Sequence, residues 1–238
     1  MHTRAEYKPE WIREDFVDFI AEKIDSIWAW KKIKAEIISV KPLSTDFIQL
    51  QLRPNKNFNF QAYQAGQSVL VTAIIGGVRQ QRSYSVVQVS PQGLLSIAVK
   101  KQGAVSNALT SLALGGIVEI SQPQGDFVLK PTERANLMIA SGSGITAIYA
   151  LLNSHLLSSS KPVDLLYFSR DNAYAAELLA LAGHYPQFKL HLINTAQQKQ
   201  HLDLALLELL VDGFMQRECY ACGASSMMQS VQQIYQHA

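Results

Sequence analysis

The sequence predicts two domains, a six-stranded antiparallel β-barrel followed by an α/β domain with a parallel sheet, and an N-terminal helical extension before both. Three observations predict this architecture. Apolar residues near the N-terminus recur at helical spacing, short apolar segments with turn residues between them fill the middle of the chain, and apolar and helical segments alternate after Pro131. We place the extension at residues 1–31, the barrel at 32–131 and the α/β domain at 132–238.

The composition of the 238 residues is that of a folded protein with a substantial core. Hydrophobic residues make up 48% and charged residues 17%, which excludes an intrinsically disordered chain. The net charge of +2 gives no reason to expect a nucleic-acid partner. No apolar run approaches the roughly 18 residues of a membrane span, and the first residues lack the apolar core of a signal peptide. We therefore expect a cytoplasmic protein without a membrane span.

The N-terminal extension is expected to form an amphipathic helix from Trp11 to Trp30. Five acidic and two basic residues lie between these tryptophans, whereas a helix on a membrane surface carries mainly lysine and arginine on its polar face. We expect this helix to pack on its own protein or on a partner. All three tryptophans lie in it, so their fluorescence should report on its docking.

Six short strands are predicted between Ile33 and Lys130, and this number suggests a closed antiparallel barrel. Gly76 and Gly77 form a two-residue hairpin turn because both positions accept a positive φ. One short helix is expected at Val105–Leu112. The six strands are Ile33–Val40, Phe47–Leu52, Ser68–Ile75, Val78–Ser85, Leu94–Lys100 and Ile117–Ser121.

The second half of the chain alternates continuous apolar strands with helices, which predicts a parallel sheet covered on both faces. The polar, proline-containing segment Lys130–Arg134 marks the join between the domains. The strands are Asn136–Ala140, Val163–Phe168, Phe188–Asn194 and Cys219–Cys222. The helices are Ile145–Leu157, Tyr174–Leu181, Leu202–Val211 and Ser225–Tyr235.

A glycine-rich turn, Gly142–Ala147, fits the pattern G-x-G-x-x-A directly after the first predicted strand of the α/β domain. Such glycines let the backbone approach a ligand, and the helix that follows offers free N–H groups to a phosphate. A glycine turn also occurs for steric reasons alone. At the end of the next strand, Arg170 precedes Asp171. An arginine can pair with the 2′-phosphate of NADP and an acid would favour NAD, so we favour NADPH, with a solvated Arg170 as the alternative.

The barrel half has two further candidate segments. Arg82–Ser85 combines a cation for a phosphate, an aromatic ring for stacking and hydroxyl groups, although in isolation it could be a polar strand end. Lys100–Asn107 leaves a strand, passes Gly103 and enters a helix with Ser106 near its start. That pattern is a second possible phosphate cradle, or an ordinary capped helix.

Four motifs in this order, Arg82–Ser85, Gly103–Ser106, Gly142–Thr146 and Tyr220–Gly223, resemble the successive motifs of the ferredoxin–NADP reductase superfamily over about residues 33–235. The resemblance implies that the arginine binds flavin phosphate, the tyrosine packs on the isoalloxazine ring, and Ser85 and Cys222 are the catalytic candidates. The candidate cofactor-binding residues are Gly66, Gln67, Arg82, Ser83, Tyr84, Ser85, Val99, Lys100, Gly103, Val105, Ser106, Gly142, Gly144, Thr146, Arg170, Cys222 and Gly223.

The resemblance implies a flavoprotein that passes a hydride from NADPH or NADH to FAD, with FMN left open, and then single electrons to a ferredoxin or iron–sulfur acceptor. The helical extension resembles bacterial reductases that serve desaturases and oxygenases. Ala147 and Ala224 stand where the family usually has proline. Two alternatives remain: an NAD(P)H:free-flavin reductase, and a non-catalytic nucleotide-binding subunit.

Cys219 and Cys222 are the two cysteines of the chain and form a C-x-x-C pair. An iron–sulfur cluster needs four cysteines, so the acceptor is expected to be a separate protein or a C-terminal domain that has been removed. Residues three apart in a strand point to opposite faces, so we expect neither a disulfide nor half of a zinc site here. No metal site is expected.

Overall fold

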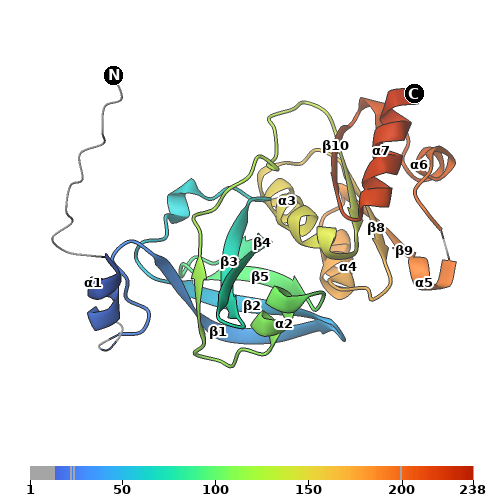
Figure 1. Cartoon of the computed structure of the whole chain (residues 1–238). Coiled ribbons are helices and arrows are strands. Elements are labelled where there is room, and N and C mark those ends of the chain that lie inside the picture. Colours follow the sequence, from blue (N-terminus) through green and yellow to red (C-terminus); the bar gives the residue numbers. More distant parts are fainter. Residues whose placement is uncertain (1–13, 22, 24, 199, 238) are drawn as a thin grey trace, which may run out of the picture.

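Two domains lie side by side in the structure, a β-barrel and an α/β domain, joined by the segment after the last barrel strand (Figure 1). The structure is a computed structural model that describes residues 14–21, 23, 25–198 and 200–237. This arrangement confirms the predicted fold class. The three residue ranges given above for the extension and the two domains stay predictions.

The barrel is closed, with the strand order β1-β2-β5-β4-β3-β6 and antiparallel pairing throughout. Aliphatic side chains fill its interior, and helix α2 (Ala104–Thr110) adds Val105 and Leu109 to that core. Because the barrel is closed, its strands are paired with a neighbour on both sides over most of the circumference. The strands are β1 (Ile33–Ser44), β2 (Phe47–Pro54), β3 (Ser68–Ile75), β4 (Val78–Val89), β5 (Leu95–Lys100) and β6 (Ile117–Ile120).

Strand β4 is longer than the predicted strand, which ended at Ser85, because it changes partner along its length. Residues up to Ser85 pair with β3, and Val86–Val89 pair with β5. Strand β1 continues past Val40 to Ser44 by pairing with β2, with one register shift between Pro42 and Ser44. Each extension pairs with the strand that follows it in the chain: Val89 lies opposite Leu95, and Ser44 lies opposite Phe47.

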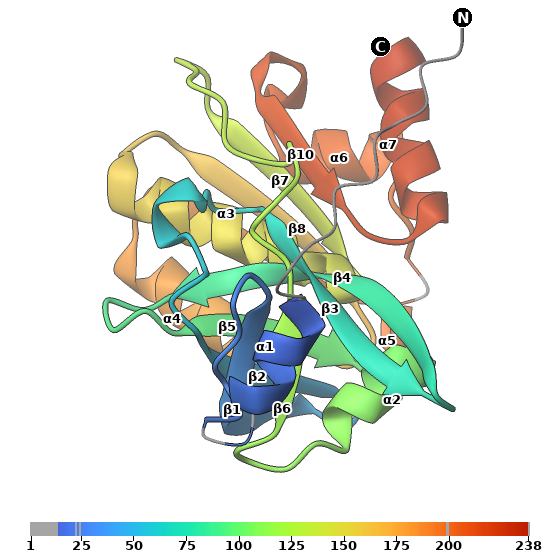
Figure 2. The same ribbon diagram turned by 60° about the vertical axis from the view of Figure 1, so that its left-hand side comes forward.

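The α/β domain has a parallel four-stranded sheet in the order β10-β7-β8-β9. Helices α3 and α4 cover the face toward the barrel, and α6 and α7 cover the other face (Figures 1 and 2). No described helix is long and apolar enough to cross a membrane. The strands are β7 (Asn136–Ser141), β8 (Val163–Ser169), β9 (Phe188–Asn194) and β10 (Glu218–Cys222). The helices are α3 (Ile145–Ser158), α4 (Ala175–His184), the single turn α5 (Thr195–Gln198), α6 (Leu204–Leu210) and α7 (Ser225–His237), with 3₁₀ turns η1 (Phe60–Ala62), η2 (Gly142–Gly144) and η3 (Phe214–Gln216).

The two domains share one apolar core. Phe47 and Val87 of the barrel belong to the same buried cluster as Leu151 of α3 and Tyr174. The Tyr174 ring meets Phe47 edge-on, and its hydroxyl donates a hydrogen bond to Gln49 at 3.0 Å. This continuous packing holds the barrel against helix α3 and gives the groove between the domains two rigid walls.

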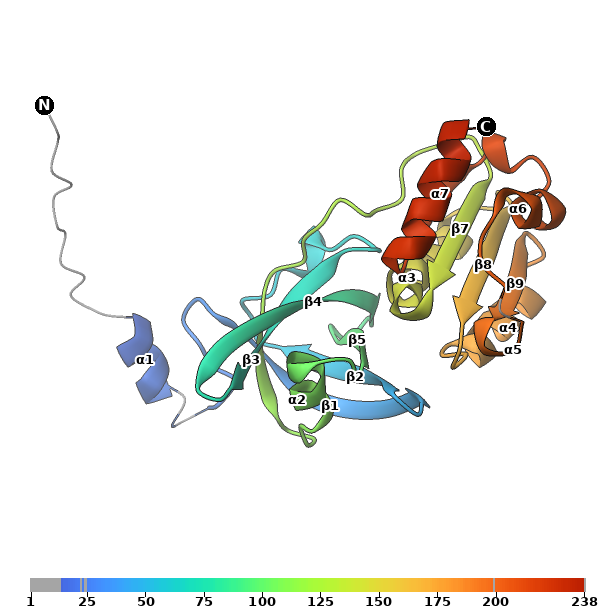
Figure 3. The same cartoon turned by 45° about the vertical axis from the view of Figure 1, so that its right-hand side comes forward.

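Helix α1 (Glu14–Ala21) lies at the end of the barrel that faces away from the α/β domain (Figure 3). The prediction of one helix from Trp11 to Trp30 was wrong for its second half, because the chain leaves the helix after Ala21 and Trp28 and Trp30 lie in a turn and loop. Residues 11–13, 22 and 24 lie outside the described part of the chain.

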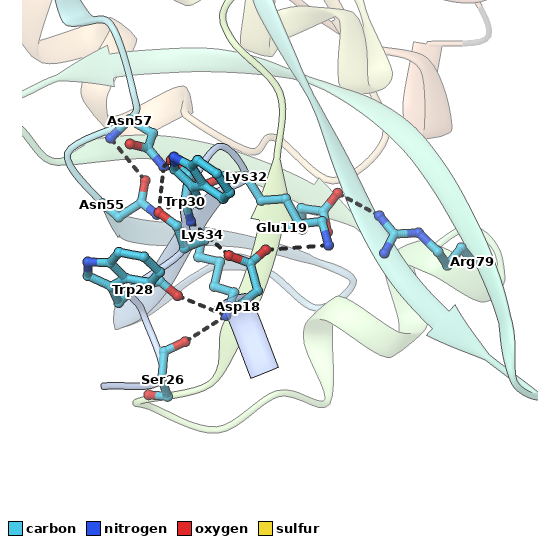
Figure 4. A network of polar contacts seen from close by, with 11 residues as sticks. Asp18, Ser26, Trp28, Trp30, Lys32, Lys34, Asn55, Asn57, Arg79 and Glu119 are labelled. Carbon is cyan, nitrogen blue, oxygen red and sulfur yellow. Dashed lines mark hydrogen bonds and ion pairs between the residues drawn. The ribbon is translucent and has the colours of Figure 1, made fainter. Parts of the chain in front are cut away.

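The loop after α1 is held by hydrogen bonds from the barrel, which explains why the helix does not continue. The side-chain amides of Asn55 and Asn57 donate to the carbonyl oxygens of Ile27, Ala29 and Lys32. Figure 4 shows both asparagines beside Trp30 and Lys32. In a helix that ran to Trp30, the Ser26 carbonyl oxygen would accept from the Trp30 N–H. Here Lys34 Nζ donates to that carbonyl oxygen at 3.2 Å, and the Trp30 N–H donates to Asp18 at 2.8 Å. The contacts of Asn55 and Asn57 join residues more than twenty positions apart, so no helical pattern could reveal them.

Helix α1 docks through its polar face. Asp18 is only 3% exposed, accepts a hydrogen bond from the Trp30 backbone N–H at 2.8 Å and forms an ion pair with Lys32 at 3.5 Å. Phe16 and Phe19 are 64% and 56% exposed. Phe16 and Phe19, two of the apolar side chains that predicted this helix, therefore point into solvent.

Candidate functional site

A pocket of about 410 Å³ lies between the two domains and is lined by both. Strands β4 and β5 and the start of α2 supply one wall, and η2, the start of α3 and the end of β10 supply the other. The lining residues are Arg82, Ser83, Tyr84, Ser85, Ala98, Lys100, Gln102, Gly103, Ala104, Val105, Ser106, Ser143, Gly144, Thr146, Cys222 and Gly223.

The pocket lies where strands β4 and β5 separate. Their pairing covers Val86–Val89 of β4, whereas Arg82–Ser85 pair with β3 and Ala98–Lys100 pair with β2. One edge of each strand therefore presents backbone N–H and C=O groups toward the gap. Because the strand edge itself faces the pocket, all four residues of Arg82–Ser85 line it, although alternate side chains point to opposite faces.

The first barrel motif supplies a cation and an aromatic ring. The Arg82 guanidinium is exposed, donates to the Gln81 carbonyl oxygen at 2.8 Å and meets no carboxylate at ion-pair distance among the described residues. Burial raises the pKa of Tyr84 above its usual value, so its hydroxyl stays protonated at neutral pH. A positive charge and a neutral aromatic face at one strand edge suit a phosphate and a planar heterocycle.

The second barrel motif is a loop that Ser106 holds open. Its hydroxyl accepts a hydrogen bond from the Gln102 N–H and donates one to the Gly103 carbonyl oxygen, both at 3.0 Å. Gly103 has a φ of +151°, and a Cβ placed on it would meet no atom within 4 Å. The loop thus leaves room for a ligand beside its backbone, which fits a nucleotide phosphate. Ser106 shapes the loop rather than offering an unused hydroxyl.

The third and fourth motifs form the opposite wall by close backbone packing. A Cβ on Gly144 would overlap the Cys222 carbonyl, and one on Gly223 would overlap the Ser141 hydroxyl. Thr146 donates a hydrogen bond to the Ser143 carbonyl oxygen at 3.0 Å. The two glycines therefore allow the ends of β7 and β10 to meet, and the wall is rigid.

Both cysteines are free thiols in the structure. Cys222 lines the pocket, and burial raises the pKa of its thiol above the usual value. It is therefore an uncharged side chain at neutral pH, which suits a neighbour of a neutral ring better than a nucleophile.

Five of the predicted cofactor-binding residues do not line the pocket. Gly66 packs against the Phe127 carbonyl and Leu151, and the Gln67 side chain donates to the Gly125 carbonyl oxygen at 3.1 Å. These two residues fasten the linker between the domains. The other three lie elsewhere: Val99 in the barrel core, Gly142 at the start of η2, and Arg170 on the surface after β8.

Four residues line the pocket without having been predicted: Ala98, Gln102, Ala104 and Ser143. Each adjoins a predicted residue in sequence, and none has a side chain that marks a cofactor site. Only the spacing of the motifs could have suggested them.

Comparisons with known proteins agree with this geometry. Residues 34–129 match the family model of the oxidoreductase FAD-binding domain, and residues 138–233 match that of the oxidoreductase NAD-binding domain. An NADPH oxidoreductase of Mycobacterium tuberculosis is 28% identical over 226 residues, which cover 89% of this chain and 58% of that protein. The glycine betaine monooxygenase reductase subunit of Chromohalobacter salexigens is 29% identical over 193 residues, covering 72% of this chain and 52% of that protein.

Solved structures share the fold. The FAD/NAD-binding domain of a nitric oxide dioxygenase from Vibrio cholerae has a TM-score of 0.77 at 22% identity, covering 87% of this chain and 93% of that one. Phthalate dioxygenase reductase has a TM-score of 0.71 at 21% identity, covering 87% of this chain and 64% of that one. The chain spans about half the length of the curated relatives it matches.

Proposed function

Because the chain belongs to the ferredoxin–NADP reductase superfamily, with its FAD-binding and NAD-binding domains, we propose that it transfers a hydride from NADPH to bound FAD and then delivers single electrons to an iron–sulfur protein. The observation that carries this proposal is the joint lining of one pocket by the two domains. A hydride moves only between rings in contact, so both nucleotide sites must open into the same space.

The pocket fits a flavin on its barrel side. The open space beside Gly103, the exposed cation of Arg82 and the free strand edge of Arg82–Ser85 supply room, charge and backbone hydrogen-bonding groups. FAD, when bound there, would accept two electrons from the donor and allow them to be delivered one at a time. The protein binds and orients the rings, and the shared apolar core limits movement of one wall against the other.

We assign the residues as follows. Arg82 binds flavin phosphate, the half-buried ring of Tyr84 stacks on the flavin, and Ser85 hydrogen-bonds near the reacting flavin nitrogen. Cys222, as an uncharged thiol, contacts the nicotinamide ring from the opposite wall. Ser85 and Cys222 thus position the reacting atoms without exchanging protons.

The proposed acceptor is a ferredoxin or iron–sulfur protein that serves an oxygenase or desaturase. Two relatives support this choice, the glycine betaine monooxygenase reductase subunit and a 3-ketosteroid-9-alpha-monooxygenase ferredoxin reductase component, the latter 33% identical over 141 residues. An iron–sulfur cluster needs four cysteines and this sequence has two, so the iron–sulfur centre is assigned to another protein or segment.

An anaerobic absorbance titration tests the proposal. The purified yellow protein should bleach on addition of NADPH, and reoxidation should proceed with a one-electron acceptor such as an added ferredoxin. Retention of the colour with both NADPH and NADH would contradict the proposal. Release of the flavin on reduction would instead favour a free-flavin reductase.

A further inference from the structure

An ion pair crosses the interdomain boundary beside the pocket. The Lys100 ammonium, at the end of β5, lies 3.2 Å from a carboxylate oxygen of Asp171, which follows β8 in the other domain. Lys100 also lines the cofactor pocket. The second carboxylate near the ammonium, Asp46, is more distant at 3.8 Å. Asp171 is therefore the main partner of Lys100.

The Asp171 carboxylate is held by further contacts from both domains. One oxygen accepts a hydrogen bond from the Ser169 hydroxyl at 2.9 Å, and the other faces the Ser44 hydroxyl of β1 at 3.4 Å. Burial alone would raise the pKa of Asp171, but hydrogen bonds from Ser169 and Lys100 outweigh burial and lower it. The Asp171 carboxylate is thus ionised at neutral pH, and it is bound to Lys100 and Ser44 of the barrel.

The segment that carries Asp171 is itself fixed in place. Asn172 and Tyr174 adopt positive φ angles of 52° and 64°, a conformation that costs free energy in residues other than glycine. The hydrogen bond from Tyr174 to Gln49 and the ring contact with Phe47 stabilise it. Contacts with the barrel therefore stabilise the conformation of this loop.

The position of Asp171 gives the ion pair a consequence for nucleotide choice. In parallel α/β sheets, an acid after the second strand accepts hydrogen bonds from the adenosine ribose and selects NAD, because a carboxylate repels a 2′-phosphate. Here the acid is neutralised by Lys100, and the adjacent Arg170 side chain is exposed. Asp46 is a second carboxylate at 3.8 Å from the same ammonium, so Lys100, Arg170, Asp46 and Asp171 together carry no net charge, and Arg170 is the exposed cation of the loop.

We propose that Lys100 is a specificity-determining residue, which selects NADPH over NADH by binding the Asp171 carboxylate and leaving Arg170 to receive the 2′-phosphate. This inference rests on the proposed function. In this proposal Lys100 does not contact the 2′-phosphate itself; it acts through Asp171.

The test is calorimetric binding of 2′,5′-ADP and 5′-ADP to the purified full chain, which needs no turnover. The wild-type protein should prefer 2′,5′-ADP. Lys100→Met exposes the Asp171 charge to the 2′-phosphate and should reduce that preference by about tenfold, on the scale of one unscreened like-charge contact. Lys41→Met is the matched control: Lys41 forms another interdomain ion pair, with Glu177 at 2.8 Å, outside the pocket, and the preference should be retained.

The double variant Lys100→Met/Asp171→Asn separates the two explanations. If Lys100 acts through Asp171, removing the carboxylate charge should restore the preference. A double variant as poor as Lys100→Met, an unchanged preference in Lys100→Met, or a wild-type protein that favours 5′-ADP would each overturn the inference. Binding of neither nucleotide to the wild-type protein would overturn the proposed function and this inference with it.

Discussion

At the scale of single residues, the charge of a pocket side chain should affect flavin binding, and the close packing of a pocket glycine should affect the free energy of unfolding. Arg82 supplies the cation of the first motif without an acidic partner among the described residues. A hydrogen bond to a charged group contributes about 1.5–3 kcal/mol.

We therefore expect Arg82→Ala to weaken flavin binding by at least about tenfold, measured as the absorbance ratio of flavin to protein after purification and dialysis. Arg79→Ala is the control on the same strand, because Arg79 pairs with Glu119 outside the pocket. Full flavin occupancy in the Arg82 variant would contradict the phosphate assignment.

Gly144 gives a second prediction at this scale. An alanine there would force its Cβ into the backbone carbonyl of Cys222, so Gly144→Ala should lower the free energy of unfolding by about 1–3 kcal/mol, the usual cost of overpacking. Gly183→Ala is the control, since its Cβ would meet nothing within 4 Å and alanine favours a helix. Urea denaturation measures both, and an unaltered midpoint for Gly144→Ala would show that β7 and β10 can move apart.

At the scale of elements, helix α1 is attached to the barrel by polar contacts. Asp18 accepts a hydrogen bond from the Trp30 backbone N–H and forms an ion pair with Lys32, while the Phe16 side chain is exposed to solvent. The docking of this helix thus depends on a buried carboxylate rather than on its apolar face.

We expect Asp18→Ala to weaken the docking of α1 by about 1–3 kcal/mol, because the Trp30 N–H loses its acceptor. The tryptophan emission maximum should shift to longer wavelength as the half-buried Trp28 becomes more exposed, whereas Trp30 is already 45% exposed. Phe16→Ala should leave the emission unchanged, because that ring is already exposed. Identical spectra for the Asp18 variant and the wild-type protein would refute this account of the docking.

At the scale of the whole molecule, the two domains are joined through a common core. Tyr174 is 3% exposed and contacts Phe47 and Gln49 of the barrel while stacking on Tyr149 of α3. The barrel and the α/β domain should therefore unfold together.

Replacing this anchor should uncouple the domains. Tyr174→Ala removes a buried ring, so we expect a loss of about 3–5 kcal/mol and two separate transitions in scanning calorimetry. Tyr174→Phe keeps the ring and loses one hydrogen bond, worth about 1 kcal/mol, so a single transition should remain. One transition at the wild-type temperature for Tyr174→Ala would contradict the shared-core account.

The candidate site was predictable to the extent that its residues lie in contiguous motifs. Arg82–Ser85 and Gly103–Ser106 could be found in the sequence because residue type and spacing within a short segment carry the chemistry. Gly66 could not be placed, because a glycine needed for close packing and one that admits a ligand look the same in a sequence. The pairing of Lys100 with Asp171 joins residues 71 positions apart, and no local pattern records it.

The sequence by itself determined the order and type of most elements, including the barrel, the parallel sheet and the motifs at their ends. Those features follow from periodicity and turn residues, which act over a few positions along the chain. The tertiary structure alone decided why α1 ends early and how the acid after β8 is neutralised. Each of these depends on which distant segments meet, and the free energy of such contacts is set by geometry that the local pattern does not contain.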